Sequence, residues 1–227
     1  MTANLKASFP EKSDQEVNHI INLAYINLAD IMVEGIKGIT MTEKQIKARY
    51  KFINPELLDE AFEIDKSVIL VAGHYNNWEW AALSPPYFFK HKMVALYKGL
   101  NNPYMNDFLK ESRSHTGVNM REIRNTASTF KEFEKSDFPS MYLLAADQSP
   151  SNTAKAFWLQ FLNQETACLP GPEKYAKMYD LPVVFAYPRR VKRGFYEIKV
   201  EWLVEDVGQC YSGEITSIFM NRLEQLI

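Results

Sequence analysis

The sequence predicts an α/β protein with a single domain over residues 1–227, in which a mixed, mainly parallel sheet is flanked by helices and preceded by an N-terminal helical segment. Apolar, strand-like runs alternate with helical segments after residue 65, which is typical of parallel sheets built from strand–helix–strand units. The chain has 227 residues, enough for one large domain. No repeat or linker divides it, so we expect a helical lead over 1–64 and an α/β core over 65–227.

Helix-start signals define the lead. Ser13 and Glu16 have the spacing of a capping box, and the apolar residues that follow recur at helical spacing. Thr42 and Gln45 repeat the capping pattern for a short second helix. The proline at residue 55 predicts the start of a third helix, because proline is favoured at the first helical position.

The core elements follow in order. Strands are expected where short apolar runs are rich in β-branched and aromatic residues, at residues 67–72, 93–97, 140–146, 182–187 and 195–203. Helices are expected at about 77–90, 103–115, 125–136 and 173–179, with a last one beginning near residue 211. The prolines at 85 and 86 should break the first of these helices, because proline has no N–H to donate.

Composition and spacing disfavour several functions. A net charge of −2 excludes a general electrostatic attraction to nucleic acid, and no nucleic-acid partner is expected. No glycine-rich phosphate loop occurs, which disfavours nucleotide chemistry. The four histidines are scattered and lack zinc-site spacing, so neither a metal nor another cofactor is expected. Cys168 and Cys210 show no Cys-x-x-Cys spacing, and we expect free thiols in a reducing compartment.

Titratable side chains follow two of the expected strands. His74 comes directly after the strand 67–72 and its terminal glycine, Glu79 lies five residues further on, and Asp147 follows the strand 140–146. The carboxyl ends of parallel strands open onto the ligand crevice of α/β proteins. We therefore expect His74, Glu79 and Asp147 to border one cleft, where histidine can take up a proton and a carboxylate can fix its tautomer.

Ordinary structural roles are the alternative for the same residues. His74 could be a hydrogen-bonded core histidine and Glu79 a solvated residue of a helix. Asp147 could cap a turn, since aspartate is common directly after strands. The position of all three near strand ends favours the functional interpretation.

Several segments together carry a resemblance to a known family. GHYNNWEW, over residues 73–80, is similar to the GHxGNWE form of the His-x4-Asp/Glu signature found in glycerolipid and lysophospholipid acyltransferases. Within that superfamily, the chain resembles the lipid A biosynthesis acyltransferases of the lauroyl and myristoyl type. The other matching segments, in order, are NL with SFPE at residues 4–11, YKGLNNPY at 97–104, DQ at 147–148 and the helix start at 221–227.

The resemblance implies an O-acyltransferase without a cofactor. Such an enzyme moves a fatty acyl group from a thioester donor, expected to be acyl carrier protein with acyl-CoA as the alternative, to a hydroxyl of a glycolipid, here a lipid A precursor. It implies that His74 is the general base and that Glu79 orients it. Acylation of another membrane lipid or lysolipid, an esterase or thioesterase activity, and a non-catalytic lipid-binding role remain alternatives. The absence of a G-x-S-x-G sequence argues against an esterase.

The resemblance also suggests residues that bind substrate. They are Asn77, Lys98, Arg113, Asp147 and Arg189, with Arg121 as an alternative to Arg113. An arginine would bind phosphate or stabilise developing negative charge. The lysine at 98 replaces an arginine of the family pattern, and Asn76 replaces a glycine. Solvated surface cations are the ordinary alternative for the arginines.

Membrane contact is the last expectation. No apolar run reaches the roughly 18–20 residues that cross a bilayer, and the N-terminus has no apolar core typical of a signal peptide. Because the family usually carries an N-terminal anchor and a longer C-terminus, we expect this sequence to lack the anchor and part of the C-terminus. We expect peripheral binding at the cytoplasmic face of the bacterial inner membrane, through the basic turn 188–194 and aromatic residues near the cleft, and weakening with salt.

Overall fold

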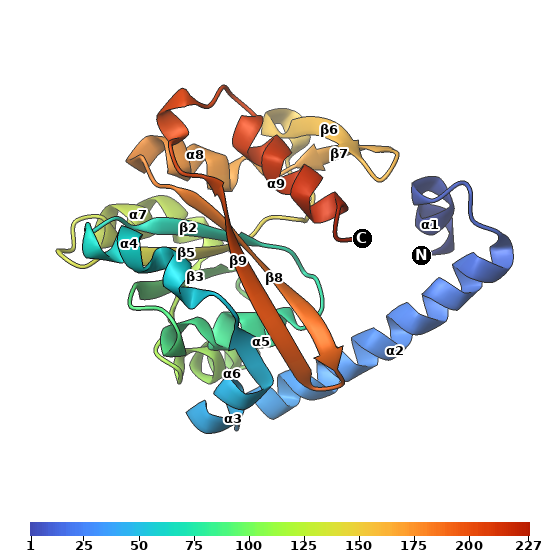
Figure 1. Cartoon of the computed structure of the whole chain (residues 1–227), viewed down its shortest axis with the longest axis horizontal. Coiled ribbons are helices and arrows are strands. Elements are labelled where there is room, and N and C mark those ends of the chain that lie inside the picture. The colour runs from blue at the N-terminus through green and yellow to red at the C-terminus, as the bar shows by residue number, and fades with distance from the viewer.

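The centre of the molecule is a seven-stranded sheet with the order β1-β9-β8-β2-β5-β3-β4. A computed structural model describes residues 1–227 (Figure 1). The strands of this sheet are β1 (Tyr50–Phe52), β2 (Val68–Ala72), β3 (Lys92–Tyr97), β4 (Asn119–Glu122), β5 (Ser140–Ala145), β8 (Val183–Lys192) and β9 (Phe195–Val204). A separate antiparallel pair consists of β6 (Phe157–Phe161) and β7 (Gln164–Cys168).

Most neighbours in the large sheet run parallel. The exception is the hairpin of β8 and β9, which is antiparallel, and β1 runs parallel to β9 at the edge. β2 lies between β5 and β8, and its last residue, Ala72, is level with Ala145 of β5. The mixed, mainly parallel sheet predicted from the sequence is therefore confirmed, and the carboxyl ends of β2 and β5 lie side by side.

Helices cover both faces of the sheet. They are α1 (Thr2–Ser8), α2 (Asp14–Gly38), α3 (Glu43–Arg49), α4 (Asp59–Glu63), α5 (Trp78–Leu83), α6 (Pro103–Ser114), α7 (Thr126–Phe133), α8 (Gly171–Tyr179) and α9 (Glu214–Glu224). Alternate residues of β2 enter two separate cores, because side chains alternate across a strand. Val68 and Leu70 pack with Trp80 of α5, whereas Ile69 and Val71 pack with Phe219 of α9.

The capping boxes expected at Ser13 and Thr42 are both present and begin α2 and α3. The helix expected over 77–90 is instead the short α5, followed by a 3-10 turn over Pro85–Tyr87. The two prolines thus end the helix, as proline chemistry predicts.

Five elements were not expected from the sequence: α1, β1, β4, β6 and β7. β1 lies within the segment 1–64 that was expected to be only helical, and it pairs with β9 through Tyr50 and Phe52. β1 and β4 are too short for a clear periodic signal. Phe157, Trp158 and Phe161 lie on β6, one strand of the hairpin.

The basic segment 188–194 is not simply a turn. β8 continues to Lys192, well past the expected end at residue 187, because β9 pairs with it along its length. Its three arginines are also engaged: Arg190 and Arg193 both bind the carboxylate of Asp30, and Arg189 binds Glu197. These ion pairs tie the hairpin to α2 and to itself.

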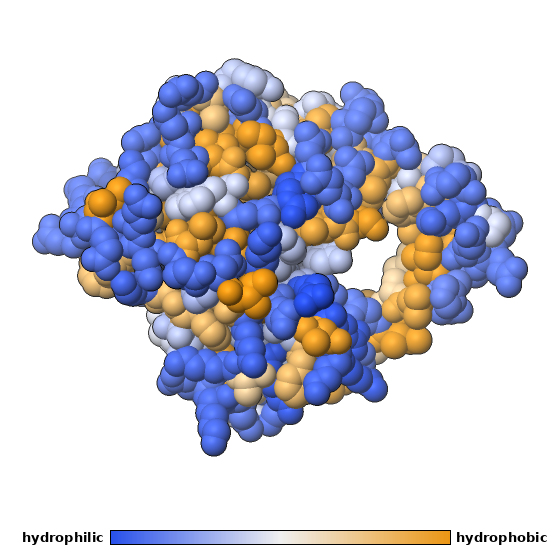
Figure 2. Space-filling model, viewed as in Figure 1, coloured by the Kyte–Doolittle hydropathy of each residue, from blue (hydrophilic) through white to orange (hydrophobic).

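The N-terminal part of α2 and α1 extend away from the sheet as an arm (Figure 1). Figure 2 shows an opening between this arm and the rest of the molecule, with apolar surface along α2. The far end of the arm is tied back, because the side chains of Asn163 and Gln164 donate hydrogen bonds to the carbonyl and hydroxyl of Ser8, at 3.0 and 2.9 Å.

Candidate active site

A histidine and an aspartate meet where β2 and β5 end. The backbone N–H of His74 donates to Oδ2 of Asp147 at 2.8 Å, and Nδ1 of its ring lies 2.7 Å from Oδ1 of the same carboxylate. The adjacent ends of the two strands produce this contact, because Ala72 and Ala145 are paired. The prediction that His74 and Asp147 lie together at one edge of the sheet is confirmed.

The contact fixes the tautomer of His74. An ionised carboxylate only accepts hydrogen bonds, so Nδ1 must carry the proton and Nε2 is left with a free lone pair. Nε2 makes no hydrogen bond within the chain, and the side chain is 35% exposed. The outward ring nitrogen is therefore free to accept a proton from a bound molecule.

Charge and burial set the pKa values of this pair. The hydrogen bond with Asp147 raises the pKa of His74 above the ordinary histidine value, partial burial opposes this, and the charges of Asp147 and Glu79 add to the rise. Burial acts to raise the pKa of Asp147, but its hydrogen bonds with His74 outweigh burial and lower the pKa overall. The pair is thus ready to hold an imidazolium beside a carboxylate.

Glu79 occupies a different position from the one expected. It lies in the first turn of α5, and both of its oxygens accept from one nitrogen of Arg113 on α6, at 3.0 and 2.9 Å. No hydrogen bond joins Glu79 to His74, although its charge contributes to the raised pKa of the histidine. The carboxylate that orients His74 in this structure is Asp147. Glu79 instead holds Arg113, whose Nε and Nη1 make no hydrogen bond within the chain.

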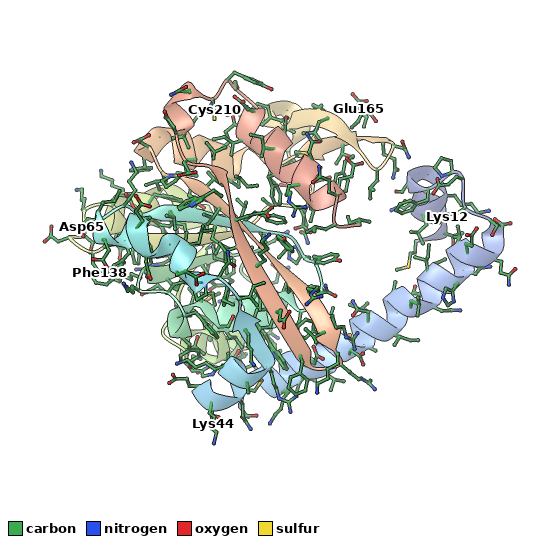
Figure 3. The ribbon with its side chains drawn as sticks, in the orientation of Figure 1. Lys12, Lys44, Asp65, Phe138, Glu165 and Cys210 are labelled. Atoms are coloured by element: carbon green, nitrogen blue, oxygen red, sulfur yellow. The ribbon has the colours of Figure 1, made fainter.

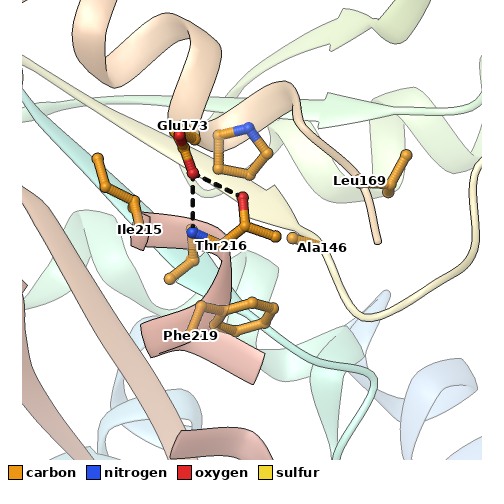
Figure 4. Close-up of a pocket in the computed structure, with 8 residues that line it drawn as sticks. Ala146, Leu169, Glu173, Ile215, Thr216 and Phe219 are labelled. Carbon is orange, nitrogen blue, oxygen red and sulfur yellow. Dashed lines mark hydrogen bonds between the residues drawn. The ribbon is translucent and has the colours of Figure 1, made fainter. Parts of the chain in front are cut away.

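Gly73 packs closely behind the histidine. A Cβ at this residue would lie 3.2 Å from Leu223 of α9 and 3.5 Å from the side chain of Asp147. α9 is itself fixed by the buried Glu173, which accepts from the N–H and hydroxyl of Thr216 at 3.0 and 2.9 Å (Figure 4). The cavity between them is about 10 Å³, the volume of one water probe and far too small for a substrate.

The turn after His74 depends on two asparagines with structural roles. Asn76 has a left-handed backbone with φ of 51°, and its amide donates to the carbonyl of Pro188 at 2.8 Å. Asn77 is fully buried; its oxygen caps α5 by accepting from the N–H of Trp80 at 2.9 Å, and its nitrogen donates to Glu34. Asn77 was expected to bind substrate, but both ends of its buried amide are occupied by the protein.

The left-handed backbone of Asn76 leads to a testable prediction. A residue with a Cβ costs about 1–2 kcal/mol in this conformation, whereas glycine adopts it freely. We expect Asn76→Ala to lower the free energy of unfolding in urea by more than Asn76→Gly, although alanine is normally the better tolerated residue. Equal losses in the two variants would show that the backbone conformation does not matter and that only the hydrogen bond to Pro188 does.

A buried carboxylate on α2 supports the same turn and was missed in the sequence. Glu34 is 8% exposed, and its Oε2 accepts from Asn77 at 2.6 Å and from the hydroxyl of Tyr196 at 2.8 Å. The carbonyl of Glu34 accepts from the indole N–H of Trp80. Asp30 and Glu34 are the only charged residues between positions 17 and 36. Two charged residues spaced four apart in an otherwise apolar helix were the sequence signal that could have predicted a buried polar role for Glu34.

The remaining predicted residues lie outside this contact network. Lys98 is exposed just after β3, at the same edge of the sheet, and makes no ion pair. Arg189 is exposed on β8 and pairs with Glu197, so the structure does not bring it to His74. Arg121 pairs with Glu132 at 2.6 Å, which leaves Arg113 as the arginine beside Glu79.

No three His, Cys, Asp or Glu side chains come together in a way that could hold a metal ion. Cys168 is buried and Cys210 is partly exposed, and both are free thiols, as expected. The polar groups of the site are therefore His74, Asp147, Glu79 and Arg113.

Comparison with known proteins identifies a family for this chain. The whole chain, residues 1–227, matches the family model described as bacterial lipid A biosynthesis acyltransferase. It is also similar to a lipid A biosynthesis acyltransferase of Haemophilus influenzae, with 25% identity over 203 residues, which cover 87% of this chain and 61% of the relative. The chain thus spans about three fifths of the length of the curated relative that it matches.

Proposed function

The chain belongs to the bacterial lipid A biosynthesis acyltransferase family, and from this premise we propose that it transfers a fatty acyl group from a thioester donor to a hydroxyl of a lipid A precursor. The observation that supports this best is the His74–Asp147 pair at the carboxyl edge of the sheet, with Nε2 of the histidine free. A hydroxyl needs such a base to become a nucleophile near neutral pH.

The proposed reaction uses His74 as a proton carrier. Nε2 takes the proton of the acceptor hydroxyl as its oxygen attacks the thioester carbonyl carbon. The tetrahedral intermediate then expels the thiolate, which takes the proton from the imidazolium and leaves as a thiol. Asp147 holds the ring and stabilises its positive charge throughout, as the carboxylate of a hydrolase triad does. No acyl-enzyme forms, because the acceptor is itself the nucleophile.

Glu79 and Arg113 have a supporting role in this proposal. Glu79 fixes the guanidinium through one nitrogen, so the unengaged Nε and Nη1 of Arg113 can donate to an anion. We propose that Arg113 stabilises the negative charge that develops on the thioester oxygen, or binds a phosphate of the acceptor. Lys98, exposed at the same edge, would add positive charge for an anionic substrate or an acidic carrier protein.

The same residues could activate water, which would make the protein a thioesterase. A product assay separates the two activities: the chain is incubated with acyl-ACP or acyl-CoA and a panel of lipid acceptors that includes lipid A precursors and lysophospholipids, and products are read by mass spectrometry. Acylated lipid A precursor supports the proposal. Free fatty acid alone would support hydrolysis, and no product with any donor would contradict a catalytic role for this chain.

We further propose that the chain binds membranes through the outer face of α2. No helix of the structure has both the length and the apolar character to cross a membrane. Tyr25, Met32, Val33 and Ile36 nevertheless face solvent, the last three with 65–71% exposure. The only charges of this stretch, Asp30 and Glu34, are buried. An uncharged, apolar helix face of this kind can lie in a lipid surface.

This proposal changes the expected effect of salt. The basic turn was expected to attract lipid headgroups, but its arginines are paired with Asp30 and Glu197. We therefore expect flotation with vesicles to change little with salt and to be lost in the double variant Met32→Glu with Ile36→Glu, while Arg189→Ala binds normally. The opposite result would be binding that is abolished by salt or by Arg189→Ala but kept by the α2 double variant. That result would show that the basic segment, rather than α2, contacts the membrane.

A further inference from the structure

A groove lies beside the loop that begins at Asp147. It has a volume of about 440 Å³ and runs between α1, the β6–β7 hairpin and the segment 149–153. Its size falls within the usual range for small-molecule sites. The opening between the arm and the rest of the molecule in Figure 2 lies on this side. Because its lining includes Ser149, two residues after Asp147, a ligand in the groove would lie close to the proposed active site.

The structure of the groove is fixed on both sides. The tip of the hairpin has left-handed residues at Leu162 and Asn163, and the N–H of Leu162 donates to Glu224 of α9 at 2.6 Å. The same tip holds α1 through Ser8. The two walls of the groove are therefore bound to each other rather than merely adjacent, which favours a preformed site.

The lining has several solvent-exposed polar side chains. Asn4, Ser149, Thr153 and Glu165 make no side-chain hydrogen bond within the chain, and neither does the indole N–H of Trp158. Figure 3 labels Glu165 on the hairpin. These groups combine amide, hydroxyl and carboxylate chemistry, so they supply both donors and acceptors. No lysine or arginine lines the groove, and a phosphate would find no cation there.

Trp158 adds an aromatic surface. It is 54% exposed, and the residue paired with it across the hairpin is Ala167, which is too small to cover the indole ring. On the same face of the hairpin, Glu165 is paired with Gln160. An exposed aromatic ring beside polar side chains suits a ligand with an apolar face and a rim of hydroxyl groups. A sugar ring has this combination.

We propose that this groove binds the carbohydrate headgroup of the acceptor lipid, with a sugar ring stacked on Trp158 and its hydroxyls bonded to Glu165, Asn4 and Thr153. The inference rests on the proposed function, in which the acceptor is a glycolipid. In this proposal the groove holds the sugar while a hydroxyl of the acceptor reaches Nε2 of His74. The groove thereby selects glycolipids over lipids that have only a phosphate headgroup.

The test measures binding without a donor or turnover. The whole chain is titrated with neutral disaccharides of glucose, galactose and N-acetylglucosamine, and separately with inorganic phosphate, while the four indole N–H signals are followed by NMR. Trp158→Phe assigns one signal by its loss. We expect at least one disaccharide to shift that signal, and Trp158→Ala and Glu165→Gln each to weaken binding by about tenfold. Tyr104→Ala removes an aromatic residue on α6 that is more exposed than Trp158 and should bind normally.

Several outcomes would overturn the proposal. They are the absence of any shift up to the solubility limit of the disaccharides, an equal shift with phosphate, and unchanged binding in both Trp158→Ala and Glu165→Gln. Glu165 is exposed, and its side chain makes no hydrogen bond or ion pair within the chain, so its variant stays informative even if Trp158→Ala is unstable. Sugar binding is measured directly and acyl transfer is measured in the separate product assay. A failure of the sugar-binding proposal can therefore be told apart from a failure of the proposed acyltransferase function.

Discussion

Replacing His74 by alanine should abolish measurable acyl transfer and leave the protein folded. A positioned general base contributes about 10²–10⁴ in rate, and no other side chain of the site combines an ordinary pKa near neutrality with a free lone pair. His74 is partly exposed at the end of β2 rather than buried in either core. Its loss should therefore cost little stability, and the melting temperature of His74→Ala should match that of the unchanged protein.

The matched control is His115→Ala. His115 is exposed at the end of α6 and belongs to no part of the proposed site, so this variant should transfer acyl groups at the normal rate. If His74 were only a structural histidine, activity would be kept, or it would be lost together with the fold. A His74→Ala protein with native melting and a near-normal transfer rate would end the proposed mechanism.

Asp147→Asn should reduce the transfer rate by roughly 10²–10⁴-fold, because the amide keeps the shape but cannot stabilise the imidazolium. The pH profile should shift as well. Asp147 raises the pKa of His74, and the base works only in its neutral form. Without the carboxylate the pKa falls, so the residual activity should persist to lower pH than in the unchanged protein. The measurement is kcat/KM as a function of pH.

Glu79→Gln is the matched comparison for that experiment. Glu79 makes no hydrogen bond to His74 but holds Arg113, so its loss should lower the rate strongly while moving the acid limb less than Asp147→Asn does. The opposite order, a larger shift of the acid limb in Glu79→Gln, would assign the orienting role to Glu79, as the sequence pattern suggested.

The sequence was informative where residues form long, regular elements. The five expected strands and the two capping boxes have clear apolar or capping signals, and the structure contains all of them. β1 and β4 were missed because they are very short, and β1 pairs with a strand far along the chain. The β6–β7 hairpin was also missed, although its two strands are neighbours in the sequence. β8 was expected to be shorter, since only its tertiary contacts show that Arg190 is paired rather than solvated.

The candidate site could also be predicted only in part from the sequence. Strand ends were enough to predict that His74 and Asp147 lie together, because neighbouring parallel strands end at one edge. The direction of Glu79 could not be predicted from its spacing. The left-handed turn at Asn76 and the buried cap at Asn77 decide where α5 begins, and they turn Glu79 toward Arg113. Glu34 was missed because its contact with Asn77 joins residues 43 positions apart.

The central claim is that Asp147, rather than Glu79, holds His74 as the base. The most direct measurement is an NMR titration of the His74 imidazole in the unchanged protein, Asp147→Asn and Glu79→Gln, with His74→Ala to identify the signal. In the unchanged protein the pKa should lie above the ordinary histidine value of about 6.5. Asp147→Asn should lower it clearly, and Glu79→Gln should lower it less. A pKa unchanged by Asp147→Asn, or one lowered mainly by Glu79→Gln, would contradict the claim.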